Sequence, residues 1–130
     1  MVGAILVVED ESLILLDVET GLQEVGFEVV TAPNAAKAIA AFDAQPDKFK
    51  GLVTDIRLGA GQSGWHVARH LRQANSTLPV IYVSGDSAIH WGAEGVPESV
   101  MITKPFALPQ IITALSTLLN AQPKPPETSV

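Results

Sequence analysis

Short apolar runs alternate with stretches of helical or irregular pattern along the whole chain. Five runs are rich in β-branched residues and show no strict polar–apolar alternation, and they cover residues 4–8, 27–31, 51–55, 79–84 and 100–103. Continuous apolar character of this kind is typical of strands that are buried on both faces of a sheet. The five runs therefore predict five buried, parallel strands.

Apolar residues at helical spacing predict the helices between these strands. The expected buried stripes are Ile14, Val18, Leu22 and Val25, then Ala35, Ala38, Ile39 and Phe42, then Val67, Ala68 and Leu71, and finally Ile111, Ile112, Leu115 and Leu118 or Leu119. Gly26 is well placed to end the first helix in a left-handed conformation, Pro33 suits the first turn of the second, and the last begins near Pro109. Two glycines and a proline within residues 87–100 predict a short or irregular fourth helix.

This alternation predicts an α/β fold of the doubly wound, flavodoxin-like type. Right-handed crossovers place helices on both faces of a five-stranded parallel sheet, for which we expect the strand order 2-1-3-4-5. Residues 1–121 are expected to form one domain. Residues 122–130 contain three prolines and no apolar face, and they predict a disordered tail.

Composition narrows the classes of partner. The 130 residues carry a net charge of −6, which disfavours nucleic acid and anionic membrane as partners. The absence of cysteine excludes disulfides and thiolate metal sites, and no apolar run approaches the roughly 18 residues that cross a bilayer. The first apolar run leads directly into Glu9, Asp10 and Glu11, which is unlike a signal peptide, so a cytoplasmic location is expected.

Charged and polar residues stand where the predicted strands end. These residues are Glu9, Asp10, Asp55, Ser84 and Lys104, and in this fold type ligands bind beyond the carboxyl ends of the strands. Two carboxylates about 4 Å apart repel by about 4 kcal/mol at an effective dielectric constant near 20. Oxygen ligands favour Mg²⁺ first and Mn²⁺ next as the neutralising cation. The lysine and the hydroxyl then complete a site for phosphoryl transfer, with Asp55 as the nucleophile.

From about residue 3 to residue 120, the sequence resembles the receiver domain of two-component response regulators. The resemblance rests on "VVEDE" at 7–11, "VTDIRL" at 53–58, "VSGD" at 83–86 and "ITKPF" at 102–106. It implies that a histidine kinase or a histidine phosphotransfer protein phosphorylates Asp55. It also implies that the chain is not an enzyme beyond catalysing its own Mg²⁺-dependent phosphorylation and dephosphorylation.

The same resemblance implies individual roles. Asp10, Asp55 and the backbone carbonyl of Arg57 would bind Mg²⁺, and Glu9 would act through a water molecule. Ser84 and Lys104 would contact the phosphoryl oxygens, and the bond between Lys104 and Pro105 is expected to be cis.

The sequence also departs from the family pattern. Glu9 stands where aspartate is commoner, Gly59 stands where proline is usual, the loop to Gly64 is one residue longer, and the interval from Ser84 to Lys104 is short. The conformational switch of the family pairs the hydroxyl of Ser84 with an aromatic residue at the position of Met101. Because methionine stands there, Tyr82, His90 and Trp91 are the candidates to replace that aromatic side chain.

Other readings of the same residues are weaker. Residues 59–64 match the dinucleotide-binding pattern G-x-G-x-x-G, but Asp55 would lie close to the expected pyrophosphate and repel it. A flavodoxin would need an uncharged phosphate loop after the first strand, and an aspartyl-phosphate phosphatase would need an aspartate at position 57. His66 and His70 lie one helical turn apart, yet no third metal ligand accompanies them.

The sequence thus predicts a receiver domain that stands alone, since no output domain follows residue 120. It would signal to an unknown downstream protein through the face formed by the fourth helical segment, the fifth strand and the last helix, or it would act as a phosphate shuttle or sink. That face could also pair two copies of the chain. The alternative is a pseudo-receiver, a docking module that is never phosphorylated, and Mg²⁺-dependent phosphorylation distinguishes the two.

Overall fold

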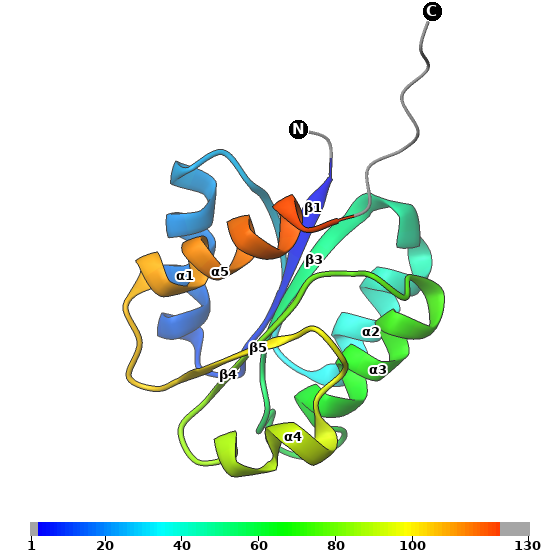
Figure 1. Cartoon of the computed structure of the whole chain (residues 1–130), viewed down its shortest axis with the longest axis vertical. Helices are drawn as coiled ribbons and strands as arrows, with labels where there is room; N and C mark the ends of the chain where they lie inside the picture. The colour runs from blue at the N-terminus through cyan, green and yellow to red at the C-terminus, as the bar shows by residue number, and fades with distance from the viewer. Residues whose placement is uncertain (1–2, 123–130) are drawn as a thin grey trace, which may run out of the picture.

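Five parallel strands form a single sheet in the computed structural model, which describes residues 3–122 (Figure 1). The strand order is β2-β1-β3-β4-β5, as predicted. The strands are β1 (Ala4–Val8), β2 (Glu28–Ala32), β3 (Phe49–Asp55), β4 (Val80–Ser84) and β5 (Val100–Thr103). The predicted disordered tail lies, except for Gln122, outside the described residues.

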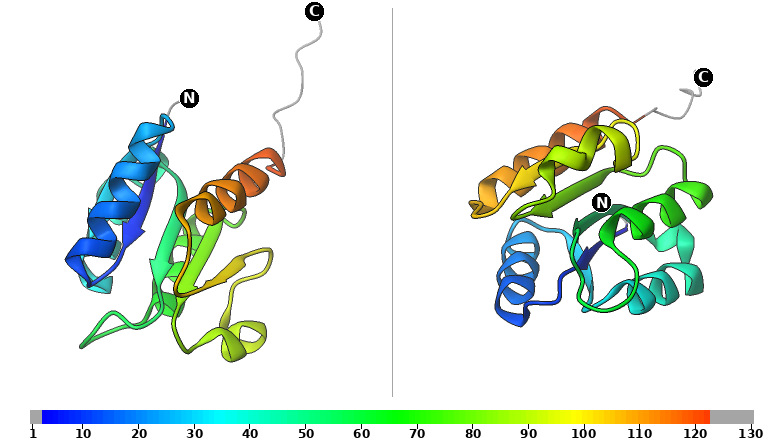
Figure 2. Two further views of the ribbon diagram at one scale, coloured as in Figure 1. Left: turned by 90° about the vertical axis from the view of Figure 1, so that its left-hand side faces the viewer. Right: turned by 90° about the horizontal axis from the view of Figure 1, so that it is seen from below.

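Helices cover both faces of the sheet, which makes three layers (Figure 2). On one face lie α1 (Ser12–Glu24) and α5 (Leu108–Asn120), and on the other lie α2 (Ala35–Ala44) and α3 (Gly64–Ala74). The short α4 (Trp91–Glu94) and two 3₁₀ turns, η1 (Pro46–Lys48) and η2 (Ala88–His90), complete the chain. Among residues 3–122, no helix combines the length and the apolar character needed to cross a membrane.

Each face of the sheet has its own apolar core. Successive residues of a strand point to opposite faces, so Leu52 packs toward α2 and α3 while Val53 packs toward α1 and α5. Strands β1, β3 and β4 are therefore buried on both faces along nearly their whole length, as expected. The expectation was wrong for β2 and β5, which are only partly buried because they form the two edges of the sheet.

The end of α1 confirms the prediction for Gly26. Its φ angle is +98°, and the N–H groups of Gly26 and Phe27 donate to the carbonyls of Gln23 and Leu22. This is the Schellman arrangement, which satisfies the last carbonyls of a helix. The placement of Val25 in the buried stripe was wrong, because the helix ends before it and its side chain is 52% exposed.

The predicted start of the second helix was also wrong. Asn34, not Pro33, precedes its first turn, and the side chain of Asn34 accepts a hydrogen bond from the N–H of Lys37 at 2.9 Å. A side-chain cap of this kind satisfies one of the free N–H groups at the start of a helix. Pro33 therefore lies before the helix, in the connection from β2.

The fourth helical segment is short, as predicted, and side chains of neighbouring elements hold it in place. The N–H of Val96 donates to the hydroxyl of the buried Tyr82 at 3.0 Å, and the indole N–H of Trp91 donates to the hydroxyl of Ser99 at 2.9 Å. Arg72 on α3 donates to the carbonyl oxygens of Leu78 and Pro97, at 2.7 Å in each case. These bonds fix the end of the segment that leads into β5.

Candidate functional site

Three carboxylates meet at the carboxyl edge of the sheet. Glu9 and Asp10 follow β1, and Asp55 is the last residue of β3. One carboxylate oxygen of each lies within 4.8 Å of the others. Glu9 and Asp55 are only 4% and 7% exposed, whereas Asp10 is open to solvent. The convergence that the sequence predicted is therefore present, with two buried carboxylates and one exposed carboxylate.

Lys104 links the two buried carboxylates. Its Nζ donates to Glu9 Oε1 at 3.1 Å and to Asp55 Oδ2 at 3.0 Å. Its backbone N–H donates to the carbonyl of Ser84 at 2.8 Å, which places the lysine beside the end of β4. The bond between Lys104 and Pro105 is cis, as expected.

Backbone contacts hold Asp55 in place. The N–H of Ile56 donates to Asp55 Oδ1 at 2.7 Å, and the hydroxyl of Thr54 donates to the carbonyl oxygen of Asp55, also at 2.7 Å. Gly64, the first residue of α3, lies so close that a Cβ built on it would be 2.0 Å from that carbonyl oxygen. The last glycine of the G-x-G-x-x-G pattern thus serves the packing of the loop against Asp55. The packing role of Gly64 therefore accounts for the last glycine of this pattern without a bound dinucleotide.

The site carries more negative charge than one lysine neutralises. Burial, and to a lesser extent the nearby charge of Asp55, raises the pKa of Glu9 to about 7, although the N–H of Glu11 and the ammonium of Lys104 act in the opposite direction. Burial disfavours the charged form of Lys104, yet its hydrogen bonds to Asp55 and Glu9 raise its pKa above the ordinary value. A cluster with this surplus of carboxylate charge and only oxygen donors fits a divalent hard cation.

Ser84 is buried at the end of β4 and is held by the loop that follows. Its Oγ accepts hydrogen bonds from the N–H groups of Asp86 at 3.2 Å and Ser87 at 2.8 Å. Both bonds use the oxygen as the acceptor, so the hydroxyl hydrogen is left to donate to a ligand.

An open hollow of about 430 Å³ exposes this site to solvent, and Asp10, Glu11, Asp55, Arg57, Ser84, Gly85, Asp86 and Lys104 line it. Across the hollow, the guanidinium of Arg57 lies 2.9 Å from the carboxylate of Asp86. From the sequence, only the backbone carbonyl of Arg57 was expected to have a role, and the contact of its side chain was not predicted. Arg57 and Asp86 stand two residues beyond the ends of the adjacent strands β3 and β4, which indicates that they are near each other but not the direction of either side chain.

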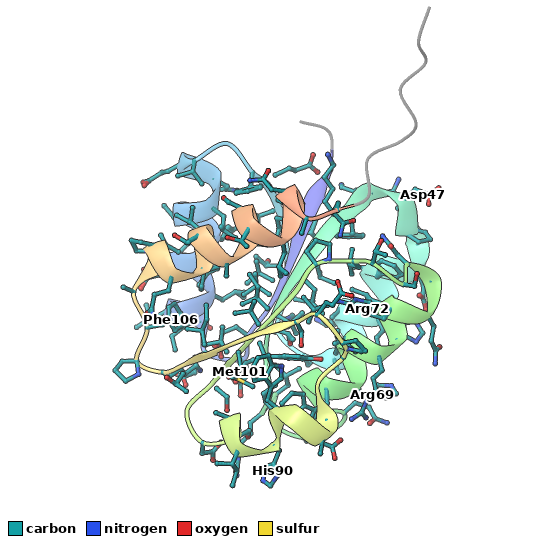
Figure 3. All side chains as sticks on the ribbon, viewed as in Figure 1. Asp47, Arg69, Arg72, His90, Met101 and Phe106 are labelled. Atoms are coloured by element: carbon teal, nitrogen blue, oxygen red, sulfur yellow. The ribbon has the colours of Figure 1, made fainter. Side chains whose placement is uncertain are left out.

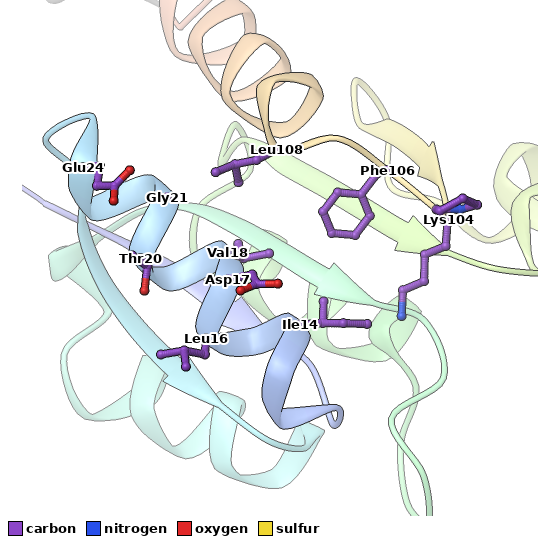
Figure 4. A pocket seen from close by; sticks show the side chains of 11 residues that line it. Ile14, Leu16, Asp17, Val18, Thr20, Gly21, Glu24, Lys104, Phe106 and Leu108 are labelled. Atoms are coloured by element: carbon purple, nitrogen blue, oxygen red, sulfur yellow. The ribbon is translucent and has the colours of Figure 1, made fainter.

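A second, larger hollow was not predicted from the sequence. It is an apolar groove of about 810 Å³ between α1 and the loop from β5 to α5, lined among others by Ile14, Val18, Phe106 and Leu108 (Figure 4). Lys104 lies at one end of this groove and also lines the acidic hollow. The groove offers apolar surface beside the carboxylate cluster, whereas the groups that can do chemistry belong to the acidic hollow.

Met101, which stands at the position of the family's aromatic switch residue, packs partly against the core. Met101, which Figure 3 labels, is partly buried. It lies beside Tyr82 in the pairing of β5 with β4 and packs on the same core as Tyr82. Of the three candidates to replace the missing aromatic side chain, Tyr82 is fully buried, and its ring packs edge-on against Trp65 with 4.7 Å between ring centroids.

Among residues 3–122, neither His66 nor His70 belongs to a group of three or more potential metal ligands. His70 pairs with Asp43 at 2.8 Å. Within residues 3–122, Glu9, Asp10 and Asp55 form the only group of three or more histidine, cysteine or acidic side chains placed to hold a metal ion.

Comparisons with known proteins agree with this geometry. The family model of the response regulator receiver domain matches residues 5–116. The transcriptional regulatory protein PrrA of Mycobacterium tuberculosis is 32% identical over 119 residues, which cover 89% of this chain and 49% of PrrA. CusR of Escherichia coli, also a transcriptional regulatory protein, is 29% identical over 118 residues, which cover 89% of this chain and 51% of CusR. The chain thus spans about half the length of the curated relatives it matches.

Solved structures show the same fold. A response regulator receiver protein from Sinorhizobium medicae superposes with a TM-score of 0.88 and 42% sequence identity, over 92% of this chain and 96% of that protein. The chemotaxis protein CheY4 of Vibrio cholerae superposes with a TM-score of 0.80 at 21% identity, over 91% of this chain and 99% of CheY4.

Proposed function

The chain belongs to the response regulator receiver domain family, and we propose that it accepts a phosphoryl group on Asp55 in a Mg²⁺-dependent reaction. The donor would be the phosphohistidine of a histidine kinase or of a phosphotransfer protein. One observation carries the proposal: the carboxylate of Asp55 lies at the end of a central strand, beside two further carboxylates and in hydrogen-bond contact with Lys104.

The residues around Asp55 suit an in-line displacement at phosphorus. A carboxylate oxygen of Asp55 forms the new bond to phosphorus while the bond from phosphorus to the donor nitrogen breaks. The electron pair of the broken bond stays on the imidazole, which takes up a proton. Lys104 and the hydroxyl of Ser84 would contact the phosphoryl oxygens, where negative charge is concentrated.

The carboxylate cluster fits the metal that the family implies. Asp10, Asp55 and the backbone carbonyl of Arg57 would hold Mg²⁺, with Glu9 acting through a water molecule, and Mn²⁺ would fit the same donors. The bound cation would supply positive charge beside the phosphoryl oxygens.

The apolar groove supports a protein as the donor. It begins at Lys104 and runs along α1, and on the same helix Leu13 and Leu16 are 79% and 55% exposed. A donor protein that covers this apolar surface would bring its phosphohistidine to the neighbouring acidic hollow. On the output side, we propose that the phosphorylated chain binds a downstream protein through the α4–β5–α5 face, where two copies could also pair, or passes the phosphoryl group on.

The test is the intact mass of the protein after incubation with acetyl phosphate or phosphoramidate. We expect a gain of one phosphoryl group in the presence of Mg²⁺ and none in its absence, because the cation would offset the charge of the carboxylate cluster. The adduct should be lost on treatment with hydroxylamine, which cleaves acyl phosphates, and the Asp55→Asn variant should gain nothing. A stable adduct on the Asp55→Asn variant would contradict the assignment.

The pseudo-receiver alternative predicts a different pair of results. A docking module would show no adduct with either small donor and no heat of Mg²⁺ binding in a calorimetric titration. Mg²⁺ binding without an adduct would instead indicate a receiver that requires a protein donor.

Asp10 should matter far more for Mg²⁺ binding than Glu11. Both carboxylates are exposed and line the acidic hollow, but only Asp10 belongs to the group of three converging carboxylates. We expect Asp10→Asn to weaken Mg²⁺ binding by about tenfold or more and Glu11→Gln by less than about twofold. Isothermal titration with MgCl₂ measures both, and equal effects would exclude Asp10 as a direct ligand.

A further inference from the structure

The residues of one ion pair, Arg57 and Asp86, both line the acidic hollow. Arg57 lies in the loop after β3 and Asp86 in the loop after β4, and their side chains meet at 2.9 Å beside Asp55. The side chains are 77% and 52% exposed. An exposed pair of this kind contributes little to stability, so its importance lies in where it holds the guanidinium.

Arg57 is a second cation, besides Lys104, that lines the acidic hollow together with Asp55. Lys104 already donates to Asp55 and Glu9, whereas the known ionic partner of Arg57 is one solvent-exposed carboxylate. A phosphoryl group brings close to two negative charges and three acceptor oxygens into the hollow. A guanidinium binds such a group through two parallel hydrogen bonds, more strongly than it binds an exposed carboxylate.

We propose that Arg57 exchanges Asp86 for the phosphoryl oxygens when Asp55 is phosphorylated, so that Arg57 binds the phosphoryl group and Asp86 competes with it. The inference rests on the proposed function, because it needs the phosphoryl group on Asp55. It adds the side chain of Arg57 to the groups that bind the phosphoryl group, beside Lys104 and Ser84.

The exchange has a consequence for the loop after β4. The N–H of Asp86 donates to Ser84 Oγ at 3.2 Å, and the hydroxyl of Ser87 donates to Asp86 Oδ1 at 3.0 Å. The bond from the Asp86 N–H to Ser84 Oγ is compatible with donation by that hydroxyl to the phosphoryl group, so the contact that is lost is the one with Arg57. Phosphorylation therefore frees the side chain of Asp86 at the start of residues 86–95, while the Tyr82 hydroxyl still holds the far end at Val96. This route to the α4–β5–α5 face needs no aromatic side chain at position 101.

A double-mutant cycle tests the exchange, with beryllofluoride and Mg²⁺ as the probe. Beryllofluoride binds a carboxylate oxygen and presents three fluorine atoms in place of the phosphoryl oxygens. The variants are Arg57→Gln, Asp86→Asn and their combination, with Arg57→Lys as the conservative replacement. All of them keep the backbone carbonyl of residue 57, so the proposed metal ligands are unchanged. Arg69→Gln is the matched control, because Arg69 pairs with Glu94 and does not line the hollow.

We expect Arg57→Gln to weaken beryllofluoride binding about fivefold and Asp86→Asn to tighten it about threefold, with Arg57→Lys between Arg57→Gln and the wild type. Arg69→Gln should bind as the wild type does. The decisive result is the combination, which should match Arg57→Gln alone, because Asp86 acts only by competing for Arg57. Calorimetric titration at fixed Mg²⁺ measures all of these affinities.

Two outcomes would overturn the inference alone, and a third would overturn the proposed function as well. If Arg57→Gln binds as the wild type does, the guanidinium does not contact the phosphoryl position. If Asp86→Asn has the same effect with and without Arg57, the two side chains do not exchange. If the wild type itself binds no beryllofluoride and gains no phosphoryl group from either small donor or a protein donor, the proposed function fails, and the inference fails with it.

Discussion

Replacement of Gly64 with alanine should lower the free energy of unfolding by about 3 kcal/mol. The added Cβ would lie 2.0 Å from the carbonyl oxygen of Asp55, 2.9 Å from its carbonyl carbon and 3.0 Å from the hydroxyl of Thr54. The two nearest atoms belong to the backbone of β3, so no flexible side chain can move aside to relieve the clash. Either the start of α3 or the end of β3 must shift. Urea unfolding followed by circular dichroism measures the loss.

The matched control is Gly92→Ala in α4. A Cβ at Gly92 meets no atom within 4 Å, and its φ angle is not in the left-handed region, so this variant should stay within about 0.5 kcal/mol of the wild type. Where the end of β3 is the part that shifts, Asp55 moves with it, and we then also expect slower phosphorylation by acetyl phosphate under conditions where the variant is folded. Equal unfolding free energies for the two variants would mean that the loop relaxes freely, and that the contact with Asp55 does not require glycine.

Most of the fold could be predicted because local and long-range preferences agree. The three central strands are apolar on both faces, so their runs are uninterrupted in the sequence and easy to recognise. Besides the two edge strands, errors fall at the ends of elements. Pro33 is suited to a first helical turn, but the side chain of Asn34 caps the helix one residue later. The third strand begins two residues before the prediction, at Phe49, whose buried ring lies 5.7 Å from that of Phe42 on α2.

The carboxylate site could be predicted because parallel strands all end at the same edge of the sheet. This rule requires only the strand order and the residues that end or directly follow each strand, and both can be obtained from sequence. It brought together Glu9, Asp10, Asp55 and Lys104, which the structure also brings together.

Features that depend on distances between loops could not be predicted. The contact of Gly64 with the Asp55 carbonyl requires the path of a glycine-rich loop in space, and the groove along α1 requires the tilt of α5 relative to it. The direction of the Arg57 side chain depends on Asp86, a residue 29 positions further along the chain (86 − 57). In each case the sequence contains the residues but not their separation.

The same cluster that would bind a cation weakens the fold when no cation is bound. Glu9 is buried beside Asp55, and Lys104 compensates for only part of the charge, so the pKa of Glu9 rises from 4.5 in its ordinary state to about 7 in the folded protein. Between these two pH values the folded protein keeps a proton that the unfolded chain has lost. The contribution of Glu9 to stability therefore falls as the pH rises from about 4.5 to about 7, and its full cost is present above pH 7.

The Glu9→Gln variant should accordingly be more stable than the wild type above pH 7 by about 2–3 kcal/mol when Mg²⁺ is removed with EDTA. A neutral amide of similar size removes the buried charge and can still accept a hydrogen bond from Lys104. The difference should shrink as the pH falls and should largely disappear near pH 4.5, where Glu9 is protonated in the folded protein and half protonated in the unfolded chain. Urea unfolding of both proteins from pH 4.5 to pH 8.5 in EDTA measures this trend.

The control for charge alone is Glu24→Gln, which removes an exposed carboxylate at the end of α1. It should change the unfolding free energy by less than about 0.5 kcal/mol, with no comparable dependence on pH. Saturating Mg²⁺ should stabilise the wild type more than the Glu9→Gln variant, because a cation at the cluster offsets the charge that the substitution removes. A Glu9→Gln variant that is less stable than the wild type at pH 8 in EDTA would show that the ion pair with Lys104 outweighs the cost of burying the carboxylate.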